Sequence, residues 1–127
     1  MAIARQTTAA KVKPGRNAIV EQGVVGATIA AGEIVSLQSD GFWDPAIATG
    51  VVLNGGIAVQ GGAVGDTIDI VVLGRIECLT GATPGAAVYC SDTAGEPAEA
   101  AGTKSFVIGY ALSASALMVM PQTVAFA

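Results

Sequence analysis

Two stretches of this 127-residue chain are imperfect copies of one another, and this internal repeat limits the folds that the chain can adopt. The first copy, about residues 26–60, begins GATIAAGEIVSLQSDGFWDPA, and the second, about residues 81–112, begins GATPGAAVYCSDTAGEPA. Two pairs of glycines align at the same offset of 53: Gly32 with Gly85 and Gly56 with Gly109. Because two copies are too few for a solenoid, the repeat predicts one small domain built from two similar β-rich halves.

The segments between the turn-forming residues predict short β-strands. Thr67–Leu73 is the strongest strand signal because its β-branched residues are dense, and Gly74 is expected to bend this strand or place a bulge in it before Arg75–Leu79. The other expected strands are Asn17–Val25, Glu33–Gln38, Phe42–Asp44, Ile57–Gln60, Ala86–Cys90, Phe106–Leu112 and Ala116–Met120. Turns recurring at about eight to twelve residues predict a mainly β fold, either a small β-barrel or a sandwich.

The first sixteen residues differ from the rest of the chain in charge. They hold no acidic residue and four of the six basic ones: Arg5, Lys11, Lys13 and Arg16. Pro14-Gly15 marks a break, so we expect an extended or flexible basic arm, residues 1–16, and a single β domain, residues 17–127. A solvated tail and an arm that docks on a neighbouring acidic protein surface are both open at this point.

The β domain is acidic, with two basic residues against ten acids, and this charge repels the phosphates of nucleic acid. We therefore expect no nucleic-acid partner. Only 13% of the whole chain is charged, about half the usual share. A monomer would expose much neutral, apolar surface, so we expect copies of this chain or a partner to cover part of it.

Residues that carry catalysis or bind metals are scarce. The chain has no histidine, which excludes Ser-His-Asp and Cys-His nucleophile pairs and histidine zinc sites. Two cysteines are too few for a four-thiolate zinc site. We therefore expect no enzyme activity, no metal and no cofactor. Cys78 and Cys90 lie in strand-like contexts, and because no secretory signal is evident we expect reduced, buried thiols in a protein made in a reducing cytoplasm.

Ser105–Ala127 contains no charged residue, and its 23 positions are long enough to span a bilayer. Gly109, Pro121 and several polar residues interrupt it, so we expect two buried strands here and no membrane partner. Phe42 and Trp43 are the candidate interface aromatics, because such side chains dominate the energetics of many interfaces. We expect one ring to pack into its own hairpin, and binding of a sugar or a partner is the alternative.

The repeated half-unit has the pattern G-D/E-x-V, a short strand, a turn with Ser-Asp, then xIGxA, and then a G-D-x-I-x-V-x-x-x-G strand. It is matched by 31–35 (AGEIV), 108–111 (IGYA), and 65–71 (GDTIDIV) with Gly74. Over roughly residues 17–121 the chain resembles the small capsid decoration (cement) proteins of tailed bacteriophages. The resemblance implies a late structural protein, made in the host cytoplasm, that assembles as homotrimers on the outer capsid surface of the virion and bridges major capsid protein subunits. It supplies no catalytic residues.

The basic arm has no secure counterpart in that family, so its role is inferred from charge. We expect it to gain little from folding back on its own domain and to lie across a neighbouring capsid subunit as an added strand. The candidate capsid-binding residues are Ile3, Arg5, Lys11, Val12, Lys13 and Arg16. The alternative function is a carbohydrate- or receptor-binding β-module displayed on a virion, with Phe42 and Trp43 as its platform.

Overall fold

The computed structural model of the protein describes residues 3–50 and 55–120. These residues form strands and a single turn of 3₁₀ helix, η1 (Ala9–Lys11), with no α-helix among them. The strands are β1 (Ala4–Arg5), β2 (Lys13–Pro14), β3 (Ile19–Val24), β4 (Ile34–Leu37), β5 (Trp43–Pro45), β6 (Gly56–Ala58), β7 (Thr67–Glu77), β8 (Leu79–Thr80), β9 (Ala87–Cys90), β10 (Pro97–Ala98), β11 (Val107–Ala111) and β12 (Ala116–Val119). The expected mainly β fold is confirmed.

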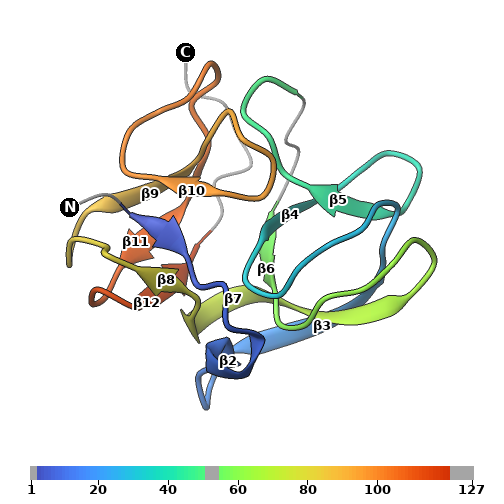
Figure 1. Cartoon of the computed structure of the whole chain (residues 1–127), viewed down its shortest axis with the longest axis horizontal. Coiled ribbons are helices and arrows are strands. Elements are labelled where there is room, and N and C mark those ends of the chain that lie inside the picture. Colours follow the sequence, from blue (N-terminus) through green and yellow to red (C-terminus); the bar gives the residue numbers. More distant parts are fainter. Residues whose placement is uncertain (1–2, 51–54, 121–127) are drawn as a thin grey trace.

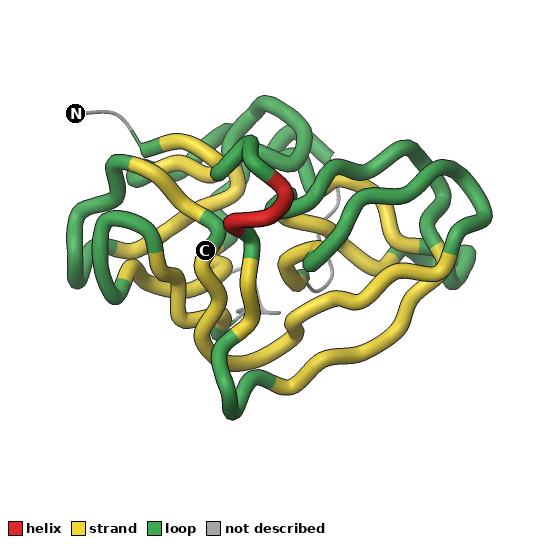
Figure 2. The backbone as a smooth tube through the Cα atoms, turned by 60° about the horizontal axis from the view of Figure 1, so that its bottom comes forward, coloured by secondary structure: helices red, strands yellow, loops and turns green. Residues whose placement is uncertain are grey.

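Eight strands follow one another in a curled antiparallel sheet, in the order β10-β9-β11-β12-β7-β6-β4-β5 (Figure 1). β2 and β3 also pair with β7, and β1 pairs with β8 in a small separate sheet. Figure 2 shows the strands bending round the molecule, with loops at their ends. The main sheet therefore has the form of half a barrel.

The long strand β7 connects the two halves of the sheet. Before Gly74 it lies between β3 and β6, and from Gly74 onward it lies between β12 and β2. Gly74 has a φ of +112°, and a Cβ added there would lie 2.9 Å from the Cα of Ala18. The predicted interruption of this strand is thus a left-handed backbone position where neighbouring backbone leaves no room for a side chain.

The two copies of the repeat have the same backbone register. β4 pairs with β6 in the first copy and β9 with β11 in the second, and the equivalent residue pairs are Val35 opposite Gly56 and Val88 opposite Gly109. The preceding turns also match. The amide of Gly32 donates to the carbonyl of Ala58 at 2.8 Å, and the amide of Gly85 donates to the carbonyl of Ala111 at 2.7 Å. The aligned glycines therefore build the same turn twice.

The buried side chains gather in two clusters. The smaller one lies in the first copy and the strands beside it, and consists of Val25, Ile29, Val35, Trp43, Ala58, Ile68 and Ile70. The larger one is made mainly of residues from β7 onward, and it includes Val12 of the arm. Cys78 and Cys90 belong to the larger cluster, and both are free and buried, which confirms the expected burial of the two thiols.

The arm lies on the β domain. Ala4–Arg5 pairs with Leu79–Thr80, and Lys13–Pro14 pairs with the end of β7. The expectation that the arm gains little from folding back is therefore wrong. Burying a side chain such as Val12 contributes about 1.5–3 kcal/mol, which is more than the exposed ion pairs of the arm offer to a partner. The division of the chain at residue 16 stays a prediction.

Within the described residues, no helix has the length and apolar character needed to cross a bilayer. The uncharged segment from Ser105 instead supplies β11 and β12, and Ile108 and Leu117 of these strands are fully buried. The last part of that segment, 121–127, lies outside the described residues.

Candidate binding surface of the N-terminal arm

The candidate residues of the arm divide into an inward set and an outward set. Ile3, Arg5 and Val12 face the β domain. Val12 is buried in the larger cluster, and Ile3 is half-buried against the same cluster, beside Pro97 and Ala98. The inward set therefore anchors the arm on the domain.

Arg5 joins the arm to both copies of the repeat. Its Nε donates to Oε2 of Glu96 at 2.8 Å, in an ion pair that is mostly shielded from solvent. One of its terminal nitrogens donates to the carbonyl of Ala31 at 3.1 Å. Ala31 belongs to the turn of the first copy and Glu96 to the second, so a single guanidinium holds three segments together. A planar group with several fixed donors suits this bridging role.

The outward set consists of Lys11, Lys13 and Arg16, which are all exposed. The 3₁₀ turn positions the first two: the amides of Lys11 and Val12 donate to the carbonyls of Thr8 and Ala9 at 2.9 and 3.1 Å. The chain then extends into β2. Because successive residues of an extended segment face opposite sides, burial of Val12 turns Lys13 toward solvent, and Lys11, the last residue of the 3₁₀ turn, is exposed as well.

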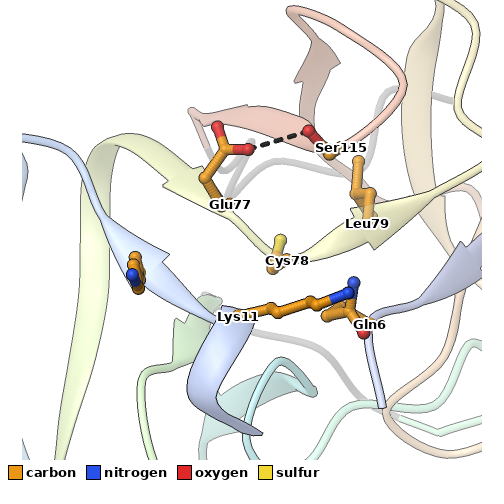
Figure 3. Close-up of a pocket in the computed structure, with 7 residues that line it drawn as sticks. Gln6, Lys11, Glu77, Cys78, Leu79 and Ser115 are labelled. Carbon is orange, nitrogen blue, oxygen red and sulfur yellow. Dashed lines mark hydrogen bonds between the residues drawn. The ribbon is translucent and has the colours of Figure 1, made fainter. Parts of the chain in front are cut away.

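Lys11 and Lys13 line an open groove of about 410 Å³ between the arm and the domain (Figure 3). Its other walls come from Gln6 of the arm and from the segment that links β7 to β8. The complete lining is Gln6, Lys11, Lys13, Glu77, Cys78, Leu79 and Ser115. The groove thus places two ammonium groups beside one carboxylate, and Cys78 and Leu79 make part of its lining apolar.

The Glu77 carboxylate is already engaged on the domain. Its Oε1 accepts from the Ser115 hydroxyl at 2.8 Å, and its Oε2 accepts from Arg75 at 3.1 Å. Neither lysine of the groove makes an ion pair with any residue that the structure describes. The groove therefore has a net positive charge on an otherwise acidic protein, and it suits the carboxylates of a partner.

The cysteine in the groove has no reactive thiolate. Burial, and to a lesser degree the charge of Glu77, raises the pKa of the Cys78 thiol to about 12. Burial alone raises the pKa of Cys90 to about 12 as well. At neutral pH both thiols stay protonated, and a protonated thiol is neither a good nucleophile nor a metal ligand. In the described part of the chain, no three His, Cys, Asp or Glu residues gather as a metal site would require.

The two candidate aromatics have different environments. Trp43 is buried, and it packs so closely over Gly23 that a side chain on Gly23 would collide with the indole ring. Phe42 is exposed at the tip of the same hairpin. The expectation that one ring of the pair packs into its hairpin is confirmed, and the packed ring is that of Trp43.

Sequence reasoning identified the lysines of the groove but missed its other wall. Glu77 and Ser115 are 38 residues apart in the sequence, and only the pairing of β7 with β12 brings them together. No short motif marks them. No protein-family model matches the chain, and no curated protein matches it either.

Proposed function

We propose that this protein is a capsid decoration (cement) protein of a tailed bacteriophage. In this role it binds the outer capsid surface as a homotrimer and stabilises contacts between major capsid protein subunits. Each copy would be a small β domain of two similar halves. The observation that carries the proposal is the arrangement of the arm, which is fixed to an acidic domain by Ile3, Arg5 and Val12 while Lys11 and Lys13 face outward.

A fixed arm is suited to binding a large acidic surface. Its backbone is already paired with β7 and β8, so docking does not require ordering a free segment, which costs about 1–2 kcal/mol per residue. Exposed ion pairs contribute only about 0–1 kcal/mol each. A trimer presents three such arms to the capsid together, and linked weak contacts then add up to a stable attachment.

The test is sedimentation of the protein with capsids that lack it, taken from the virus that encodes this chain. Lys13→Glu reverses one charge of the groove, and Lys104→Glu makes the same charge change at an exposed lysine outside the groove. We expect Lys13→Glu to weaken binding about tenfold at constant salt, because three pairs are lost per trimer, and Lys104→Glu to change it less than about twofold. Absence of binding by the wild type, or equal losses in both variants, would contradict the proposal.

The alternative, a carbohydrate- or receptor-binding module, rested on Phe42 and Trp43 acting as one platform. Because the Trp43 ring is buried, only Phe42 remains available to stack on a sugar. If sugars nevertheless quench tryptophan fluorescence, and Phe42→Ala abolishes that quenching, the alternative replaces the present proposal.

A further inference from the structure

Two exposed apolar patches lie at opposite ends of the ladder formed by β3 and β7. At one end Ile19 pairs with Leu73, and at the other Val24 pairs with Thr67, directly after the turn that holds Val64. Strands rise about 3.3 Å per residue, so the five steps from Ile19 to Val24 in β3 separate the two ends by about 17 Å. One copy of the chain therefore cannot bring its own two patches together.

The first patch, here called the base pocket, is a hollow of about 420 Å³ whose walls include Arg16, Ile19, Leu73, Arg75 and Met118. Ile19 and Leu73 face each other across the ladder and are 49% and 45% exposed. The two arginines lie beside this apolar pair. Arg75 makes one ion pair, with Glu77, and both partners of that pair are substantially exposed. The base pocket thus combines apolar side chains with positive charge.

The second patch, here called the tip patch, comprises Asp40, Phe42, Val64 and Asp66 on two neighbouring turns. Val64 is 68% exposed, the most of any large hydrophobic residue that the structure describes, and Phe42 is 42% exposed. Both of these side chains line a second, smaller hollow, together with Asp40. The tip patch thus combines protruding apolar side chains with negative charge.

The acidic residues of the tip patch also fix its shape. Asp40 accepts a hydrogen bond from the amide of Phe42 at 3.0 Å, and Asp66 accepts one from the amide of Ala63 at 2.9 Å. Such bonds, in which an aspartate carboxylate accepts from a backbone amide two or three residues away, stabilise tight turns. Phe42 and Val64 are therefore presented on ordered turns, which lowers the entropy lost when a partner covers them.

We propose that the tip patch of one copy docks into the base pocket of the next copy. The two patches match in both respects, since exposed apolar side chains meet apolar side chains and aspartates meet arginines. A contact between two different patches is heterologous, and it closes into a ring when its rotation allows. This inference rests on the proposed function, because it names the contact that would hold the homotrimer together.

The experiment uses two double variants of the full chain. Ile19→Ser/Leu73→Ser removes the apolar part of the base pocket, and Phe42→Ser/Val64→Ser removes that of the tip patch. All four side chains are exposed, so the fold should persist. Val20→Ser/Met120→Ser is the matched control, because it also removes two exposed apolar side chains, but from outside both patches.

Light scattering should give three times the chain mass of 12.5 kDa for the wild type and the control, and one chain mass for each double variant alone. A mixture of the two double variants should form a species of two chain masses. Each such pair keeps one intact contact, from the unaltered tip patch of one variant to the unaltered base pocket of the other. Loss of the second contact stops growth at two chains.

Three results would overturn the inference: a wild type that stays monomeric at about 1 mM, double variants that keep the wild-type mass, or a mixture that stays monomeric. A symmetric interface between like patches would give the second of these for one variant, because the double variant that keeps the self-pairing patch would still associate with itself. Capsid binding by the wild type is measured separately. Its absence would overturn the proposed function and leave the contact between copies standing.

Discussion

The two copies of the repeat share a backbone and differ in what covers their apolar side chains. In the first copy, Trp43 on the second strand of the hairpin lies over Gly23 and completes the smaller cluster. In the second copy the corresponding strand is Pro97–Ala98, which carries no aromatic residue. The arm takes that place, with Ile3 beside Pro97 and Ala98. The repeat therefore specifies turns and strand register, while each copy is covered in its own way.

The largest loss of stability is expected when a side chain is added at the equivalent glycines of the two copies, Gly56 and Gly109. A Cβ on Gly109 would collide with the carbonyl oxygen of Met118, and a Cβ on Gly56 would lie 2.8 Å from the carbonyl oxygen of Val71. Backbone oxygens of a neighbouring strand cannot move aside as side chains do. We expect Gly109→Ala to cost about 4 kcal/mol and Gly56→Ala about 3 kcal/mol in the free energy of unfolding.

Urea unfolding measures both values. Gly41→Ala is the control for adding a methyl group, because a Cβ there meets no atom within 4 Å, and its positive φ accounts for the smaller cost of that variant. Equal stabilities of Gly109→Ala and Gly41→Ala would show that the strands do not approach as closely as described.

The next prediction removes Trp43, the side chain that covers the smaller cluster in the first copy. Trp43→Ala should destabilise the protein by about 3 kcal/mol, because a buried aromatic side chain is lost and a cavity remains. In the Ile19→Ser/Leu73→Ser background, where no second copy covers Phe42, Phe42→Ala is one residue away and exposed and should cost less than about 0.5 kcal/mol. Thermal unfolding followed by circular dichroism distinguishes the two. Similar losses would mean that Trp43 is not part of the core.

The sequence predicts the strands and turns of the two copies, but it does not predict which distant segments cover them. Each strand expected from turn spacing is present, and Thr67–Leu73, now part of β7, is the clearest prediction because its β-branched residues are dense. β1, β2 and β10 were not expected. Strands of two residues show no periodicity, and they form here because distant segments pair with them. The sequence predicts the lysines of the groove, because the basic residues of the arm are close together in the chain. It does not predict the contact of Glu77 with Ser115, because these residues are 38 positions apart.

A smaller loss in the free energy of unfolding is expected for substitutions at Gly32 and Gly85, the glycines of the repeated turn. Gly32 and Gly85 have φ values of +86° and +85°, so alanine at either position costs about 1–2 kcal/mol in backbone strain. Only Gly32 is also close to the arm, with a Cβ position 3.3 Å from Cγ2 of Val12, whereas Gly85 is open. Gly32→Ala should therefore be the more destabilising by about 1 kcal/mol.

A double-mutant cycle tests whether the arm causes that difference. In a Val12→Ala background the contact with Cγ2 is removed while the carbonyl oxygen of Gln6, 3.2 Å from the Cβ position, remains, so the two substitutions should couple by about 0.5 kcal/mol. Gly85→Ala has no such neighbour and should be additive with Val12→Ala. Additivity at both positions would show that the arm does not distinguish the two turns.

The last comparison concerns the two thiols, which report on opening of the arm. Cys78 lines the groove and its carbonyl accepts from the amide of Gln6, whereas Cys90 lies within β9. At pH 8 both native thiols are protonated, because burial raises their pKa to about 12, so labelling by a thiol reagent requires local opening.

Arg5→Ala removes the guanidinium that holds the arm to Glu96 and Ala31. A partly buried, charge-assisted contact of this kind contributes about 1.5 kcal/mol, so the arm should open about tenfold more often. Labelling of Cys78, followed by peptide mass spectrometry, should accelerate by that factor while Cys90 changes less than about twofold. Lys11→Ala, in the same arm but outside that contact, should accelerate neither thiol. If both cysteines accelerate equally in Arg5→Ala, the arm and the second copy open as one unit, and the arm is not a separable covering.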